Sequence, residues 1–173
     1  MKFYIKSLYP EDEKKNRLER ENGIIEDPIE LSWFDDFQKY CLEWSEQERP
    51  SKIFLSDKFI LVLFYKDSNT CPYPNNLVRY NLKKEVIGII QTPKPLQYKG
   101  NNLLLISSIG KVKIIDNVEH LSVVISTGDY DMGFSEFRYL NLETFEYHPT
   151  YYEIQELFGQ YSKTPTRWEY FGR

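Results

Sequence analysis

The hexapeptide Phe59–Phe64, FILVLF, decides the class of fold that this 173-residue sequence predicts. It is an apolar run of strand length, rich in β-branched and aromatic residues, as expected of a strand covered on both faces. Further segments of strand composition, separated by polar loops, follow at 77–82, 85–91, 103–110, 111–116, 121–127, 135–142 and 145–149. Residues 51–149 therefore predict a mostly antiparallel β-meander.

The segment Leu31–Glu48, LSWFDDFQKYCLEWSEQE, predicts the strongest helix of the chain. Ser32 stands as an N-cap, and Asp35 follows three residues later in a capping-box position. Apolar residues recur at three- and four-residue intervals and form one stripe, as in a helix packed on a sheet; they are Trp33, Phe34, Phe37, Tyr40, Cys41 and Trp44. We expect a helix over about residues 32–48, ended by Pro50.

A second, short helix is predicted at residues 151–158, where Thr150 and Glu153 form a T-x-x-E capping box. The tail after it could pair as an edge strand or pack through Trp168 and Phe171. The expected fold is α+β, with both helices flanking the sheet. The length fits one domain, 1–173, made of a helical acidic part (1–50), the β-meander (51–149, which two related units could build) and a helix with its tail (150–173).

The net charge of −4 is unevenly distributed. Residues 1–50 carry 8 Lys/Arg and 13 Asp/Glu, a balance of −5. No basic stripe is present, which argues against nucleic acid as a ligand. The acidic third favours a basic protein partner, with Asp35, Asp36 and Glu43 as candidate contacts. The alternative is a solvated acidic helix face.

The sequence begins without the long apolar run of a signal peptide, and no window is apolar over the roughly 18 residues that would span a membrane. We therefore expect a cytoplasmic protein with no membrane partner. Cys41 and Cys71 are the two cysteines, too few for a disulfide framework, although one disulfide between them is open.

No motif for catalysis or for a cofactor is present. His120 and His148 have no second His or Cys at the spacing of zinc ligands. The sequence also has neither a G-x-S-x-G elbow nor a G-x-x-x-x-G-K-[ST] phosphate loop. We therefore expect no catalytic residue, no metal ligand and no cofactor.

The loop at 127–133, TGDYDMG, carries two carboxylates between two glycines. A D-x-D pair can present oxygen atoms to calcium or magnesium, but a complete site needs further ligands. The pattern favours a hairpin connection whose Asp129, Tyr130 and Asp131 are open to a partner. Together with Tyr73 of the loop at 68–76, these residues form the alternative site for a small ligand or an enzyme substrate.

An internal similarity links the two halves of the β-region. Each contains an apolar strand, a polar loop, an Arg-Tyr strand and an Asn-Leu pair, with Arg79 and Arg138 in corresponding places. The stretch LVRYNLKKEVIGII, 77–90, resembles the outer hairpin of a β-propeller blade. The resemblance implies a curved antiparallel meander and no particular activity. Two such units are too few for a closed propeller.

In size and composition the chain resembles bacterial toxin-immunity proteins, being small, acidic, rich in tyrosine (14 residues) and without catalytic motifs. The resemblance implies a non-catalytic protein-binding module that neutralises a basic toxin domain, such as a nuclease, by occluding it. The alternatives are a ligand-binding protein or enzyme that uses the loops at 68–76 and 127–133, and a structural subunit of a larger assembly. The sequence leaves the oligomeric state open.

Overall fold

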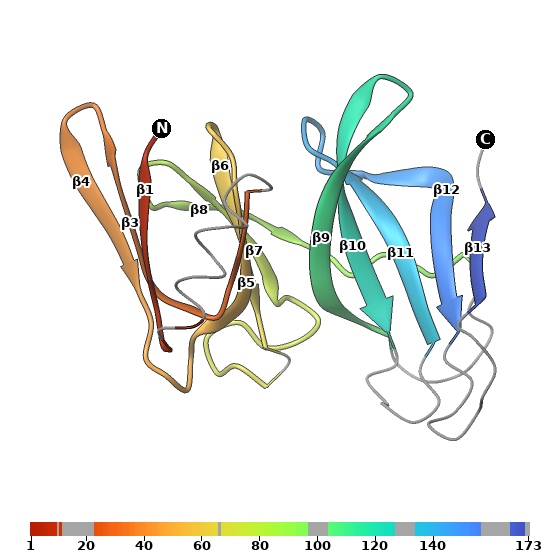
Figure 1. The fold of residues 1–173 in the computed structure, drawn as a ribbon, viewed down its shortest axis with the longest axis horizontal. Coiled ribbons are helices and arrows are strands. Elements are labelled where there is room, and N and C mark those ends of the chain that lie inside the picture. The colour runs from red at the N-terminus through yellow and green to blue at the C-terminus, as the bar shows by residue number, and fades with distance from the viewer. Residues whose placement is uncertain are drawn as a thin grey trace. The chain divides into compact units, whose positions relative to one another are not determined.

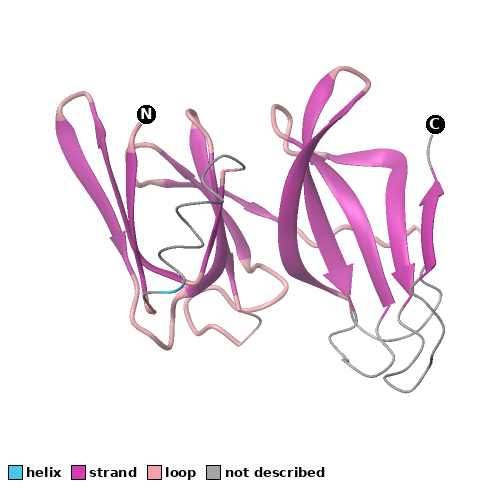
Figure 2. Ribbon diagram, viewed as in Figure 1, coloured by secondary structure: helices cyan, strands magenta, loops and turns pink. Residues whose placement is uncertain are grey.

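The computed structural model of the chain describes residues 1–9, 11, 23–65, 67–96, 104–126, 134–156 and 167–171. Thirteen strands, paired antiparallel in three sheets, are the regular elements within these residues (Figures 1 and 2). The chain divides into two compact units, Met1–Gln91 and Thr92–Arg173. The predicted antiparallel sheet is confirmed, but the α+β fold class is wrong, because the described chain is almost entirely β. The assignment of one domain stays a prediction.

Unit 1 contains two sheets. The first has the strand order β1-β3-β4, with β1 at Phe3–Ser7, β3 at Pro28–Asp35 and β4 at Gln38–Glu43. The second has the order β2-β5-β6-β7-β8; its strands are β2 (Ile24–Glu26), β5 (Pro50–Leu55), β6 (Phe59–Phe64), β7 (Leu77–Asn81) and β8 (Val86–Ile90).

Strand β6 lies at the centre of the five-stranded sheet, and all six of its residues are buried. The prediction that FILVLF is a strand covered on both faces is therefore confirmed. One face packs with residues of the three-stranded sheet into a common core, which includes Ile60, Val62 and Phe64 of β6 and Leu31, Trp33 and Leu42 of β3 and β4. Unit 1 is thus held together by apolar burial between two sheets.

Trp33 is the largest fully buried side chain of this core. Its ring lies 6.0 Å from that of Phe3 and 5.9 Å from that of Tyr40, measured between ring centroids. Its indole Nε1 donates a hydrogen bond of 2.8 Å to the carbonyl oxygen of Leu82, in the turn between β7 and β8. One residue of β3 therefore ties the three-stranded sheet to the five-stranded sheet, and its buried N–H is satisfied.

The predicted helix at about 32–48 is wrong, because this segment forms the β3–β4 hairpin. Asp35 pairs with Gln38, Trp33 with Tyr40 and Leu31 with Leu42, so residues on one face lie three, seven and eleven residues apart. One to three turns of an α-helix span about 3.6, 7.2 and 10.8 residues. A hairpin with a two-residue turn therefore reproduces the spacing of a helical stripe. Pairing with β1 and burial of Trp33 favour the strand.

Unit 2 contains one five-stranded meander in the order β13-β12-β11-β10-β9 (Figure 1). Its strands are β9 (Leu105–Ile115), β10 (Val118–Ser126), β11 (Phe134–Asn141), β12 (Tyr147–Glu156) and β13 (Arg167–Phe171). Strands β10 and β11 pair directly, as predicted for the segments flanking the loop at 127–133. Strand β13 pairs with β12, so the tail does form an edge strand.

The predicted helix at 151–158 is also wrong. Residues 151–156 belong to β12, while 157 and 158 lie outside the described residues. Tyr152 and Glu153 pair with Arg138 and Phe137 of β11, and the same residues pair on their other side with β13. Pairing with strands on both sides outweighs the local capping signal, because it satisfies the backbone groups of a segment with β-prone tyrosines.

The similarity between the two halves corresponds to one shared structural feature. Asn81 ends β7 and Asn141 ends β11, and each side-chain oxygen accepts backbone N–H groups of the turn that follows. The main-chain N–H groups of Asn81 and Asn141 donate across the turn to Glu85 and Glu146 respectively. The repeated Asn-Leu pair therefore marks two similarly capped hairpin turns.

We expect Trp33→Ala to lower the free energy of unfolding by about 3–5 kcal/mol, since it removes a fully buried aromatic side chain and its hydrogen bond. Phe34→Ala is the control, because Phe34 is the next residue of the same strand and is 53% exposed; its effect should stay within about 0.5 kcal/mol. Urea unfolding followed by circular dichroism measures both changes. Equal losses would contradict the alternation of a strand.

Candidate functional site

The tip of the β3–β4 hairpin presents two aromatic and two acidic side chains together. Phe34 and Asp35 end β3, and Asp36 and Phe37 form the turn. Phe34 is 53% exposed and Phe37 is completely exposed. Figure 1 shows the hairpin extending beyond the neighbouring strands of unit 1. We call these four residues the hairpin tip.

The backbone of the turn is unfavourable for Phe37. Asp36 and Phe37 have φ angles of 45° and 64°, the left-handed pair of a two-residue hairpin turn. The β9–β10 hairpin makes the same kind of turn with Asp116 and Asn117, at 52° and 63°, and these residue types tolerate that region. A bulky side chain held there costs on the order of 1 kcal/mol. The fully exposed ring of Phe37 gains no packing energy that would offset this cost.

The structure unites some of the predicted contact residues and separates others. Asp35 and Asp36 are neighbours at the hairpin tip, whereas Glu43 lies at the other end of the hairpin, opposite Glu30. Glu43 there accepts a hydrogen bond of 3.5 Å from the Cys41 thiol. Burial, together with this carboxylate, raises the pKa of Cys41. Cys41 and Cys71 are both free thiols, so no disulfide joins them.

The sequence singled out the two aspartates but placed Phe34 and Phe37 in a buried helical stripe. Their exposure follows from the hairpin, because a strand alternates its faces and a turn residue contacts neither sheet. The pair Asp36-Phe37 also lacks the Asn-Gly or Asp-Gly signature that marks such turns. No signal in the sequence alone identified these two residues as exposed.

The alternative site is only partly within the described chain. Tyr73 is half-buried in the loop at 68–76 of unit 1, while Asp129, Tyr130 and Asp131 lie outside the described residues. The start of the Tyr73 loop is occupied by Glu48. Its carboxylate accepts hydrogen bonds from the hydroxyl groups of Ser68 and Thr70. It also accepts the main-chain N–H of Asn69, the main-chain N–H of Thr70 and the side-chain amide of Asn69. The polar groups of this segment are therefore used internally.

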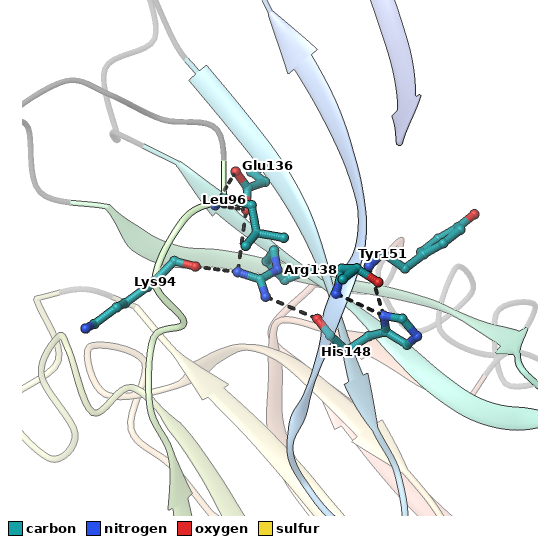
Figure 3. Close-up of polar contacts among 7 residues, drawn as sticks. Lys94, Leu96, Glu136, Arg138, His148 and Tyr151 are labelled. Atoms are coloured by element: carbon teal, nitrogen blue, oxygen red, sulfur yellow. Dashed lines mark hydrogen bonds and ion pairs between the residues drawn. The ribbon is translucent and has the colours of Figure 1, made fainter. Parts of the chain in front are cut away.

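Unit 2 contains a buried ion pair that holds the segment Thr92–Leu96, which we call the strap (Figure 3). The Glu136 carboxylate is fully buried, lies 3.6 Å from the Arg138 guanidinium and accepts the Leu96 N–H at 2.9 and 3.1 Å. Arg138 donates to the carbonyl oxygens of Lys94 and His148. Burial lowers the pKa of Arg138, and Glu136 opposes that shift. These bonds compensate the removal of both charges from water.

The opposite face of this sheet carries a second polar cluster. The Tyr139 hydroxyl donates to the buried Glu153 carboxylate at 2.6 Å, and Lys113 forms an ion pair with the same oxygen. Burial, reinforced by Glu153, raises the pKa of Tyr139 well above its usual range. Tyr139 therefore stays protonated and acts as a hydrogen-bond donor, which suits a structural role and not that of a nucleophile.

His148 fixes the bulge that interrupts β12. Its Nδ1 accepts hydrogen bonds from the main-chain N–H groups of Thr150 and Tyr151, at 3.3 and 2.9 Å (Figure 3). Its Nε2 lies 3.3 Å from Asp116 Oδ2. Among the described residues, no group of three or more His, Cys, Asp or Glu side chains could hold a metal ion. His120, His148, Glu136 and Glu153 are instead bonded to side chains or to the backbone of unit 2.

Comparison with protein-family models, with curated proteins and with solved structures found no match to this chain. The part of the chain that the structure describes contains no helix long and apolar enough to cross a bilayer.

We expect Phe37→Gly to raise the free energy of unfolding by about 1 kcal/mol, because glycine adopts a φ of 64° without steric cost and no buried contact is lost. Asn117→Gly at the matching position of the β9–β10 turn is the control and should change stability by less than about 0.5 kcal/mol. Denaturant unfolding measures both, and a loss of stability in Phe37→Gly would show that the ring packs on the protein.

The hydrogen bonds between the Glu48 carboxylate and residues 68–70, which we call the Glu48 anchor, should be lost in acid. Hydrogen bonds from Ser68 and Asn69 lower the pKa of Glu48 from 4.5 to about 2. Because the folded-state value lies below the ordinary one, the anchor is fully present above pH 4.5 and is lost as the pH falls towards 2. The amide chemical shifts of Asn69 and Thr70 should titrate with that low midpoint, and Glu48→Gln should abolish the transition. A midpoint near 4.5 in the unmodified chain would contradict the hydrogen-bonded anchor.

Proposed function

We propose that this chain is a non-catalytic protein-binding module, and that the hairpin tip is its principal contact with a basic protein partner. The single observation that carries the proposal is Phe37, a completely exposed aromatic residue in a backbone conformation that disfavours it. Strained backbone clusters at active sites, ligand clamps and switch regions, so an outlier at an exposed position supports a hypothesis of binding. Exposed aromatic rings are among the side chains that contribute most to protein interfaces.

The charges next to the rings indicate the kind of partner. Asp35 and Asp36 lie between Phe34 and Phe37, and residues 1–50 carry a charge balance of −5. Acidic groups around apolar anchors steer a basic partner and set its orientation, while the rings supply most of the affinity. A basic protein surface with a recess for an aromatic side chain fits this tip.

We further propose that the partner is a basic toxin domain and that the chain acts in the cytoplasm as an immunity protein that occludes it. This proposal is supported by the small size, the acidic N-terminal third and the exposed acidic-aromatic hairpin. Occlusion requires only a stable complex at a functional surface of the toxin and needs no chemistry from the inhibitor.

Co-expression with the product of a neighbouring gene that is toxic to the host tests this function. The unmodified chain should restore growth and bind the toxin in calorimetry, whereas Phe37→Ser combined with Asp36→Asn should weaken binding by roughly 30-fold or more, as expected for an interface hot spot. Asn suits the left-handed position 36, and Ser at position 37 is less bulky than the ring it replaces, so the variant should fold.

The control is Ile114→Ser combined with Asp116→Asn at the tip of the β9–β10 hairpin, where an exposed apolar residue and an exposed aspartate are altered in the same way. It should bind like the unmodified chain. Failure to restore growth in the presence of any neighbouring toxin would contradict the immunity function. Equal binding by the Phe37 variant would contradict the placement of the contact at the hairpin tip.

A further inference from the structure

Strand β12 is interrupted by a bulge in its pairing with β11. Arg138 of β11 pairs with Tyr152, and Leu140 pairs with Tyr147, so two residue steps on β11 correspond to five on β12. Strand β12 therefore carries three extra residues between these pairs, and we call residues 148–151 the β12 bulge. Backbone N–H groups in such an insertion lose their partners across the ladder and need others.

The imidazole of His148 supplies these partners. Its Nδ1 accepts the main-chain N–H groups of Thr150 and Tyr151 at 3.3 and 2.9 Å (Figure 3). An imidazole nitrogen accepts hydrogen bonds only when it carries no proton, so the ring is neutral and its proton is on Nε2. The distance of 3.3 Å from Nε2 to Asp116 Oδ2 agrees with this tautomer, in which Nε2 donates. The bulge is therefore closed by the neutral form of His148.

The carboxylate that faces the ring lies on the side away from Nδ1. Asp116, in the turn between β9 and β10, contacts Nε2 and has a side chain that is 85% exposed. It can accept from Nε2 whether or not Nδ1 carries a proton, and solvent screens its attraction for a positive ring. The side chain of His148 is 14% exposed, so the ring can exchange protons with solvent.

Neighbouring strands place aromatic and basic groups near the ring. His120 of β10 lies edge-on to His148, at 5.6 Å between ring centroids, and the two rings would repel each other if both were charged. The Tyr151 ring of β12 lies 6.0 Å away. Arg138 of β11 donates to the main-chain oxygen of His148, and Lys113 of β9 pairs with His120 in the ladder. These groups offer a proton on Nδ1 no negative charge.

From this geometry we propose that the β12 bulge is an acid-sensitive switch, which opens when Nδ1 of His148 takes up a proton. A protonated Nδ1 is a donor and would face two N–H donors, so its bonds to Thr150 and Tyr151 must break. The closed bulge is therefore present at neutral pH and is lost as the pH falls through the range in which histidine titrates, about 7 to 5. The switch lies in unit 2 and does not depend on the hairpin tip.

Opening of the bulge reaches the strap through Arg138. Its guanidinium donates to the carbonyl oxygen of His148 in the bulge and to that of Lys94 in the strap (Figure 3). Among the described residues, its buried Nε has no hydrogen-bond partner. Loss of the His148 oxygen would leave a second buried donor unsatisfied, which is costly unless the guanidinium moves to other partners. We therefore expect the strap to loosen when the bulge opens.

Nuclear magnetic resonance of the full chain, titrated from about pH 7.5 to 5, tests the switch. The amide signals of Thr150 and Tyr151 should move with the same midpoint as the ring nitrogens of His148. Their protection factors against hydrogen exchange should fall roughly tenfold or more. The amide of Leu96, which is bonded to Glu136, should report loosening of the strap with the same midpoint.

Two results with the unmodified chain would overturn the switch. One is a His148 ring that takes up no proton down to pH 5, and the other is a ring that titrates while the amide signals of Thr150 and Tyr151 stay fixed. A fixed Leu96 signal would overturn the link between the bulge and the strap.

His148→Asn identifies the titrating group. Asparagine Oδ1 lies at about the position of imidazole Nδ1 and can accept the same N–H groups, but it does not titrate. This variant should therefore keep the bulge closed over the whole pH range. His120→Asn is the matched control: it removes the adjacent imidazole, while its amide can donate to the Val118 oxygen as the ring does. It should show the transition of the unmodified chain. A transition that persists in His148→Asn, or that is lost in His120→Asn, would overturn the assignment.

Discussion

Burial of Trp33 between the two sheets of unit 1 is the constraint on which the hairpin and the candidate site depend. The indole donates a hydrogen bond to the Leu82 carbonyl and packs between Phe3 and Tyr40. These contacts fix which face of β3 points into the core. With Trp33 inward, the alternation of a strand turns Phe34 outward. The chain then reverses at Asp36 and Phe37, where neither sheet can cover the side chains. The exposed tip is thus a direct consequence of a buried residue three and four positions earlier.

The interiors of the two units are stabilised by different interactions. Unit 1 is closed by apolar side chains of two sheets. The single sheet of unit 2 instead has polar groups buried on both faces: Glu136 and Arg138 hold the strap on one, and Tyr139 and Glu153 bond to each other on the other. Each of these four side chains has a hydrogen-bond partner, whereas the buried Arg138 Nε, Thr92 Oγ1 and Tyr147 hydroxyl of the same unit have none among the described residues. The lowered pKa of Arg138 and the raised pKa of Tyr139 therefore reflect a structural network, and the fully exposed Phe37 lies in unit 1.

Some of this architecture could be predicted from the sequence. FILVLF was identified as a buried strand because an apolar run of only six residues, rich in β-branched and aromatic side chains, favours a strand covered on both faces. Asp35 and Asp36 were selected as contacts from their charge alone, which does not depend on secondary structure. The β3–β4 hairpin could not be predicted, because its same-face residues fall at helical separations and its turn uses Phe37 where Gly or Asn is usual. Glu136 and Arg138 were missed because burial of a charged pair depends on the strap, which is distant in sequence.

Leu31–Glu43 forms a hairpin with Trp33 inward and Phe37 at its exposed tip. Nuclear Overhauser spectroscopy of the labelled chain tests this hairpin. Cross-strand contacts should appear between Trp33 and Tyr40 and between Leu31 and Leu42, and Phe37 should show no long-range contacts. A continuous series of contacts between sequential amide protons from Trp33 to Cys41, the pattern of a helix, would contradict it.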